Sequence, residues 1–118
     1  MLVSGDEPLD ELSIAGPSTI IRIGACGSGR SRITPADAGL ASHELTALKG
    51  GDAQFNASAL RRLLQGEQGA YRDAVLLNAA AALIVAGEVN TLSDGVEEAA
   101  ETIDRGLAKA LLDCWIAF

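Results

Sequence analysis

The segment from Arg72 to Ala86 constrains the fold of this chain more than any other. It is apolar on nearly every side of a helix, which is typical of a helix that is buried all round. Five small side chains in it let neighbouring backbones approach closely: Ala74, Ala79, Ala80, Ala81 and Ala82. Asn78 interrupts the segment, and we expect it to be a hydrogen-bonded core amide rather than a ligand. Because such a helix needs partners on every side, the segment indicates a piece of a larger fold.

Residues 42–118 as a whole favour helices. His43 to Leu48 predicts a short helix ended by Gly50 and Gly51, and Asp52 is a cap for a helix that Gly66 interrupts. Gly87 is expected to end the apolar helix. Thr91 and Asp94 have the spacing of a capping pair, and a last helix is expected from about Leu107 to Trp115. The helix after Thr91 has one apolar stripe: Leu92, Val96, Ala99, Ala100, Ile103 and Leu107.

Residues 1–41 have a different character, rich in Gly, Ser, Pro and Ile. The β-branched run Thr19–Ile23 predicts a strand, and Gly24–Gly29 is a loop from which Arg30–Thr34 returns as a short partner. A hairpin, or an irregular excursion at a sheet edge, is the expected product. Leu2–Val3 resembles the last two residues of a buried strand. The fold class is therefore α/β, mostly helical, with a short strand and a β-hairpin.

Charge and composition exclude several classes of protein. The formal charge of −7 argues against binding to nucleic acid, and 48% hydrophobic residues exclude a disordered acidic tail. We expect no secretory signal, because Met1–Gly5 has no basic or apolar region and acidic residues follow at once. We expect no membrane span, because the longest apolar run falls short of about 20 residues. Cys26 and Cys114 are far apart and without ligand neighbours, so they are expected to be reduced thiols. These features favour the cytoplasm.

The densest polar cluster is Asp6-Glu7-Pro8-Leu9-Asp10-Glu11. Carboxylates that follow a strand can bind Mg²⁺, which prefers oxygen ligands, although on residue types alone a solvated acidic turn is the simpler interpretation. Gly24–Gly29 predicts a hairpin turn rather than a phosphate loop, because no helix follows it. Lys49-Gly50-Gly51-Asp52 predicts a C-cap followed by an N-cap. His43 and Asn56 are expected to be a surface histidine and a satisfied amide.

Taken together, these segments resemble the C-terminal part of anthranilate phosphoribosyltransferase. The series that carries the resemblance is Leu9–Ser13, Gly16–Ser18, Pro35–Leu40, Leu48–Ala53, Asn56–Ala57, Gly66–Glu67, Arg72–Leu83, Ala86–Gly87 and Gly95–Val96. Leu9–Ser13 and Arg72–Leu83 are the most specific matches. Two positions depart from the family pattern: Pro8 stands where the family usually has Gly, and Phe55 where it often has Glu.

The resemblance implies a function and a metal site. Members of this family transfer phosphoribosyl from phosphoribosyl pyrophosphate to anthranilate in tryptophan biosynthesis, and so are pentosyltransferases that use Mg²⁺. Asp10 and Glu11 match the family's metal-binding acidic pair, which moves the interpretation of the acidic cluster to a metal site. No catalytic or cofactor-binding residue is implied, because the family's glycine-rich diphosphate loop and anthranilate contacts lie upstream of the residues present here.

The resemblance also implies an organisation. Residues 1–118 are expected to be a partial C-terminal α/β domain, with the strand end, metal loop and hairpin in 1–41 and a helical layer in 42–118. The complete enzyme is expected to be a homodimer, and the isolated chain to be inactive or nearly so. The alternatives are a non-catalytic helical interaction module, half of a split enzyme that needs a partner chain, and another activity of the wider phosphoribosyltransferase and nucleoside phosphorylase group.

Overall fold

A three-stranded antiparallel sheet forms the N-terminal part of the chain in this computed structural model, which describes residues 1–7, 9–24 and 27–118. The strands β1 (Leu2–Gly5), β2 (Ser18–Gly24) and β3 (Gly27–Ile33) lie in chain order, with β2 in the middle. The predicted hairpin is confirmed. β3 starts earlier than expected, because Gly27 already pairs with Gly24.

Three residues lie outside the described part of the chain, and two of them carry expectations. These are Cys26, expected to be a reduced thiol, and Pro8, which departs from the family pattern in the acidic cluster; Ala25 is the third. The other cysteine, Cys114, is free and exposed, as predicted.

β1 is longer and more exposed than expected. It pairs with β2 from Leu2 opposite Ile21 to Gly5 opposite Ser18. The prediction that Leu2–Val3 ends a buried strand is wrong for Leu2, which is 59% exposed, while Val3 is half-buried. The reason is that successive side chains of a strand point to opposite faces of the sheet, and the described residues cover only one of these faces at β1.

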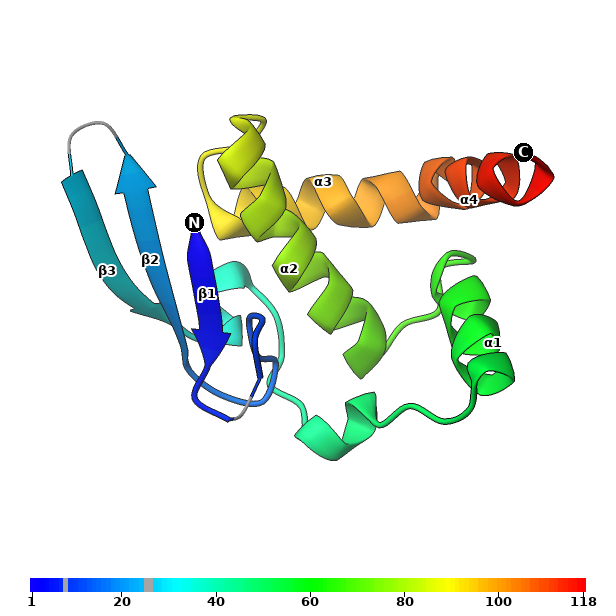
Figure 1. The fold of residues 1–118 in the computed structure, drawn as a ribbon, viewed down its shortest axis with the longest axis horizontal. Coiled ribbons are helices and arrows are strands. Elements are labelled where there is room, and N and C mark those ends of the chain that lie inside the picture. The colour runs from blue at the N-terminus through cyan, green and yellow to red at the C-terminus, as the bar shows by residue number, and fades with distance from the viewer. Residues whose placement is uncertain (8, 25–26) are drawn as a thin grey trace.

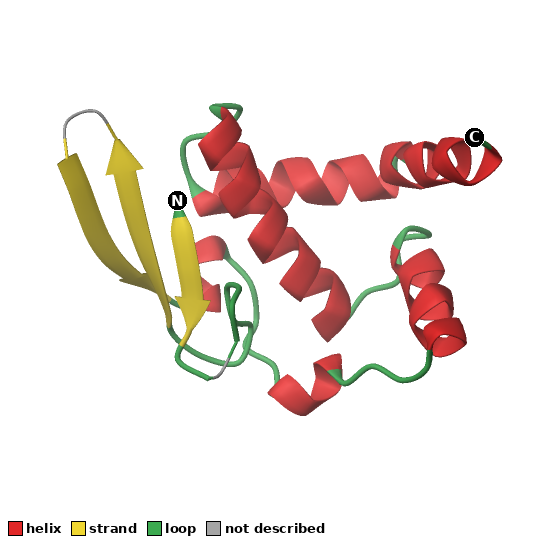
Figure 2. Ribbon diagram, viewed as in Figure 1, coloured by secondary structure: helices red, strands yellow, loops and turns green. Residues whose placement is uncertain are grey.

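The chain after β3 is mostly helical, as predicted (Figure 1). Two short 3₁₀ helices, η1 (Pro35–Ala38) and η2 (Leu45–Leu48), lead into α1 (Ala53–Leu63), α2 (Ala70–Ala86), α3 (Leu92–Asp104) and α4 (Leu107–Ala117). α2 lies between the sheet and α1, and the two chain ends lie on opposite sides of the molecule (Figure 2). Among the described residues, no helix is both long enough and apolar enough to cross a membrane.

η1 begins with a cap made by the carboxylate of Asp37. The backbone N–H and the hydroxyl of Thr34 both donate to Oδ2 of Asp37, at 2.7 and 2.8 Å. These bonds stabilise the carboxylate, so they lower the pKa of Asp37, the backbone bond having the larger effect. The cap fixes the turn that delivers Pro35 and Ala38 to the core.

Two apolar clusters hold the elements together. The larger joins the sheet, the segment after β1, α2 and α3 through Leu12, Ile14, Ile20, Ala38, Leu77, Ala80, Ala81 and Leu92. The smaller joins α1, α2 and α3 through Leu63, Leu76 and Ile103. α2 and α3 both contribute to the two clusters, but α2 supplies Leu76, Leu77, Ala80 and Ala81 against Leu92 and Ile103 from α3, so α2 is the central element of the fold.

α2 and α3 approach closely, as the alanines of α2 predicted. A Cβ added to Gly95 would lie 2.7 Å from both Cα and Cβ of Ala80, so only glycine fits at this crossing. At the other end of the pair, Arg72 is 4% exposed and donates to both carboxylate oxygens of Asp104, at 2.8 and 2.9 Å. The crossing and the bidentate ion pair together fix how the two helices lie.

The described residues do not bury α2 on every side. Tyr71 is 41% exposed and Val85 is 62% exposed. Leu107, assigned to the apolar stripe of α3, instead begins α4 and is 52% exposed.

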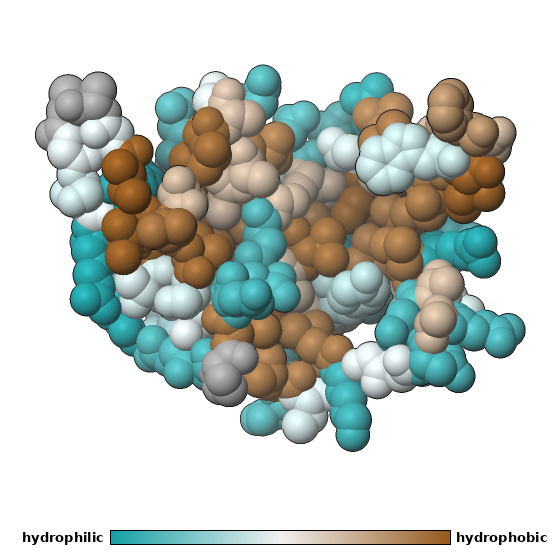
Figure 3. All heavy atoms as spheres, viewed as in Figure 1, coloured by the Kyte–Doolittle hydropathy of each residue, from teal (hydrophilic) through white to brown (hydrophobic). Residues whose placement is uncertain are grey.

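Hydrophobic side chains gather at the C-terminal end of the molecule, over α4 (Figure 3). An open apolar groove of about 480 Å³ runs between α1, α2 and α3. The described residues thus leave these faces without partners.

The cap of α3 gives a first test of the fold. The hydroxyl of Thr91 accepts a hydrogen bond from the Asp94 N–H at 3.1 Å, as the spacing predicted. Thr91→Ala is expected to lower the free energy of unfolding by about 1 kcal/mol, measured by urea denaturation. Thr91→Ser keeps the hydroxyl and is the matched control; an equal loss in this variant would contradict the role of the cap.

Candidate functional site

The acidic loop, residues 6–11, leaves the end of β1 and is held at its start by the backbone. The Gly5 N–H donates to the Leu9 carbonyl and the Asp6 N–H to the Pro17 carbonyl, both at 3.1 Å. Asp10 and Glu11, which we call the acid pair, follow this turn and are exposed. The structure thus places both predicted metal ligands side by side in the chain and accessible to a ligand.

The segment after the acid pair is buried without forming a helix or strand. Leu12, Ser13 and Ile14 are at most 1% exposed. Their backbone groups are bound by three partners: the Asn78 side chain holds Leu12, the Ser18 hydroxyl accepts from the Ser13 N–H, and the His43 N–H donates to the Ile14 carbonyl. The acid pair therefore stands on an anchored segment.

The two other acids of the loop have different surroundings. Arg32 of β3 donates to Asp6, and this bond raises the pKa of the Arg32 guanidinium. The Oε2 atom of Glu7 is buried and without a hydrogen-bond partner among the described residues, and it packs towards Gly5. Neither side chain is brought into a cluster with the acid pair.

The donor chemistry of the acid pair fits Mg²⁺. The described residues contain no group of three or more His, Cys, Asp or Glu side chains that could hold a metal ion. Mg²⁺ does not require such a cage, because it is usually bound by one or two carboxylates, with water and substrate phosphates completing its shell. Two exposed neighbouring carboxylates match that donor set.

The structure assigns structural roles to the other candidates. Gly24–Gly29 lies at the turn of the β2–β3 hairpin, as predicted, though Ala25 and Cys26 are outside the described residues. His43 is not a plain surface histidine: it is half-buried, with Nε2 2.7 Å from Oδ2 of Asp73. Asn78 is the satisfied amide that was expected.

For the segment before α1, one of the two predicted caps is confirmed and the other is wrong. Asp52 caps α1 by accepting from the Phe55 N–H at 2.8 Å. The predicted glycine C-cap is wrong: η2 ends with Lys49 in an extended conformation. Gly50 instead lies close to Asn56: a Cβ on it would be 2.7 Å from Oδ1 of Asn56, the end of an exposed side chain. That amide is satisfied, as expected, by the N–H and carbonyl of Gly51.

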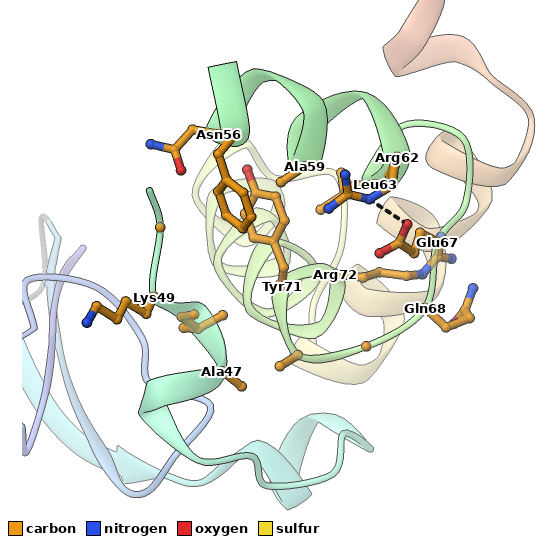
Figure 4. A pocket seen from close by; sticks show the side chains of 15 residues that line it. Ala47, Lys49, Asn56, Ala59, Arg62, Leu63, Glu67, Gln68, Tyr71 and Arg72 are labelled. Atoms are coloured by element: carbon orange, nitrogen blue, oxygen red, sulfur yellow. Dashed lines mark ion pairs between the residues drawn. The ribbon is translucent and has the colours of Figure 1, made fainter. Parts of the chain in front are cut away.

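A second hollow of about 420 Å³ lies between η2, α1 and the start of α2 (Figure 4). Its guanidinium groups are already neutralised, since Arg62 pairs with Glu67 at 2.9 Å and Arg72 with Asp104. Lys49 extends away from Tyr71 at the rim (Figure 4). These pairs leave the acid pair as the candidate site that the described residues support best.

Sequence reasoning missed the contacts that support this site. The bond between Asn78 and Leu12 spans 66 residues, and the pair of His43 with Asp73 joins a loop to α2. The single available signal was Asn78 itself, a polar residue within an apolar helix, which indicated buried hydrogen bonds without naming their partner.

Comparison with known proteins confirms the resemblance. The chain is 63% identical over 117 residues to the anthranilate phosphoribosyltransferase of Sphingopyxis alaskensis, covering 99% of this chain and 35% of the relative. It is 60% identical over 116 residues to that of Novosphingobium aromaticivorans, covering 98% of this chain and 35% of the relative. The chain thus spans about a third of the length of the curated relatives it matches.

Solved structures agree with the sequences. The anthranilate phosphoribosyltransferase of Thermus thermophilus matches with a TM-score of 0.88 and 40% identity, over 98% of this chain and 34% of that one. The Saccharomyces cerevisiae enzyme in complex with phosphoribosyl pyrophosphate and Mg matches with a TM-score of 0.85 and 26% identity, over 94% of this chain and 32% of that one. The expected α/β fold class is confirmed. Since the model of the glycosyl transferase family, a/b domain, matches residues 1–109, the chain belongs to that family.

Proposed function

We propose that this chain is the metal-binding part of an anthranilate phosphoribosyltransferase, which transfers phosphoribosyl from phosphoribosyl pyrophosphate to anthranilate in tryptophan biosynthesis. The observation that carries the proposal is the exposed acid pair, held on an anchored segment in a chain 63% identical to such an enzyme. We place this pentosyltransferase in the cytoplasm.

Asp10 and Glu11 are the residues that would hold Mg²⁺. When bound, the ion neutralises the negative charge that develops on the pyrophosphate leaving group. The chain's own contribution is to hold two neighbouring, exposed acidic residues on an anchored backbone. A solved relative carries Mg together with phosphoribosyl pyrophosphate, which supports the same pairing of ligand and metal here. Another yeast structure is in complex with 4-fluoroanthranilate, which supports the acceptor.

The substrate contacts are proposed to come from outside these 118 residues. We interpret the chain as a partial C-terminal α/β domain, with 1–41 carrying the metal loop and hairpin and 42–118 the helical layer. The exposed apolar side chains of α4 and the groove beside α2 favour packing against the remaining part of such a fold. The complete enzyme is proposed to be a homodimer, and the isolated chain to be inactive.

A chimera tests the function directly. This chain would replace the matching third of the Sphingopyxis alaskensis relative, and formation of phosphoribosyl anthranilate would be followed by the loss of anthranilate fluorescence. We expect turnover within about 10-fold of the parent enzyme, because the junction keeps the family's own contacts, and none from the 118-residue chain alone. Clear turnover by the isolated chain would contradict the proposed division of the site.

The outcome of the chimera also separates the alternatives. A folded chimera without turnover, in the presence of Mg²⁺ and both substrates, would favour the non-catalytic interaction module. Activity restored by mixing this chain with the remaining two-thirds of the relative as a separate polypeptide would favour the split enzyme.

A further inference from the structure

The Asn78 side chain makes three hydrogen bonds, and two of them are to the backbone of Leu12, the residue directly after the acidic loop. Its Oδ1 accepts from the Leu12 N–H at 2.9 Å, and its Nδ2 donates to the Leu12 carbonyl at 3.0 Å. The second Nδ2 hydrogen goes to the Ala74 carbonyl in its own helix, also at 3.0 Å. Rotating the amide would place N–H groups opposite the Leu12 N–H, so the network fixes one orientation.

The buried backbone of Leu12 depends on Asn78 for its hydrogen bonds. Leu12 directly follows Glu11 and is 1% exposed, so its backbone has little access to water as an alternative partner. It lies in no regular element, so no strand or helix supplies its hydrogen bonds. The Asn78 amide takes the place of a neighbouring strand for this one residue.

The acid pair is therefore fixed from both sides. Before it, the Gly5 N–H holds the Leu9 carbonyl; after it, Asn78 holds both backbone groups of Leu12. Only the two carboxylate-bearing residues lie between these points. Because the anchor after the pair comes from α2, the central helix of the fold sets where the carboxylates stand.

We infer that Asn78 is a positioning residue for the metal-binding acid pair, acting through the backbone of Leu12. The inference rests on the proposed function in that it takes Asp10 and Glu11 as the metal ligands. Partners that hold the ligands of a metal typically contribute about 10- to 100-fold to metal affinity. Asn78 positions the acid pair by binding the neighbouring backbone, not by binding the carboxylates.

The chain contains a matched control for the chemistry. Asn56 makes the same kind of two-bond contact, with Oδ1 accepting from the Gly51 N–H at 2.9 Å and Nδ2 donating to the Gly51 carbonyl at 3.0 Å. This contact lies before α1, away from the acidic loop. Asn56→Ala thus removes an equivalent amide–peptide pair without touching the backbone of Leu12.

The test measures the acid pair with and without metal, in the full chain, by nuclear magnetic resonance. Mn²⁺ alone is titrated as a paramagnetic probe, and it is expected to broaden the amide signals around Asp10 and Glu11 first. Asn78→Ala is expected to raise the Mn²⁺ midpoint by about 10- to 100-fold, while Asn56→Ala keeps it. Without metal, amide order parameters at Asp10 and Glu11 are expected to fall below about 0.6 in Asn78→Ala alone.

The two readouts separate this inference from the proposed function. Broadening centred away from Asp10 and Glu11 in the unaltered chain would contradict the metal assignment, and the order parameters would still test the anchor. An unchanged midpoint and unchanged order parameters in Asn78→Ala would overturn the inference, as would an equal effect of Asn56→Ala. If Asn78→Ala does not fold, Asn78→Asp keeps the acceptor for the Leu12 N–H and loses both donors, and wild-type values in that variant overturn the inference.

Discussion

Asp10→Asn and Glu11→Gln are each expected to lower kcat/KM for phosphoribosyl transfer by about 10²- to 10³-fold in the chimera that carries this chain. Each change keeps the size and shape of the side chain and removes its negative charge. Amide oxygens are weaker ligands for Mg²⁺ than carboxylates, so less charge on the leaving group is neutralised. Both carboxylates are exposed, so their replacement leaves the packing of the core unchanged.

The measurement is the steady-state rate at several Mg²⁺ concentrations. Asp6→Asn is the matched control, because Asp6 is an exposed acid of the same loop that pairs with Arg32. We expect this control to stay within a few-fold of the unaltered chimera. Excess Mg²⁺ is expected to restore part of the activity of the acid-pair variants. Wild-type kcat/KM in both acid-pair variants at limiting Mg²⁺ would contradict the metal site.

The identity of the acid pair illustrates what residue types can and cannot reveal. Two neighbouring carboxylates after a strand suit a solvated turn as well as a metal ligand, and the structure brings no third protein ligand to them within its described residues. Mg²⁺ takes its other ligands from water and substrate, so the sequence carries only part of the signal. The resemblance to a family, rather than the pattern of charges, distinguished Asp10 and Glu11 from Asp6 and Glu7.

Local features of the fold could be predicted because their causes are local. The β-branched run became β2, and Asp52 and Thr91 cap their helices through bonds to residues three positions away. Contacts across the chain could not be predicted in the same way. A polar Asn78 in an apolar helix indicated that its amide must be hydrogen-bonded. That Leu12 is the partner depends on how α2 packs against the segment after β1.

Burial was the least predictable property. An apolar helix indicates that its faces can be covered, not which segment covers them. α2 packs one face on the sheet and α3, whereas Val85 on another face is exposed. Leu107 continued the periodic stripe of α3 in sequence, but α3 ends at Asp104, and Gly106, where φ is +74°, separates it from α4. One break in the helix was enough to place this leucine on the surface.

Gly95→Ala is expected to lower the free energy of unfolding by about 2 kcal/mol, the largest effect on stability that we predict for a single methyl group. In an exposed helix the same change would raise stability by about 1 kcal/mol, because alanine favours helices over glycine. Here the new Cβ would lie 2.7 Å from Cα of Ala80, a backbone atom that cannot rotate away. α3 must move off α2, which loosens the packing of Leu92 and Val96 on the larger core cluster, and overpacking of this kind typically costs about 1–3 kcal/mol.

Urea denaturation of the full chain measures this effect, with Gly29→Ala as the matched control. A Cβ at Gly29 meets no atom within 4 Å, so this variant should unfold at the wild-type midpoint or slightly above it. A double-mutant cycle with Ala80→Gly assigns the clash: removing the Ala80 methyl relieves the contact with its Cβ, but leaves those with its Cα and carbonyl oxygen. Rescue in the double variant should therefore be partial. A gain of stability in Gly95→Ala would show that α2 and α3 separate at little cost, and would remove the close crossing as the reason for glycine at this position.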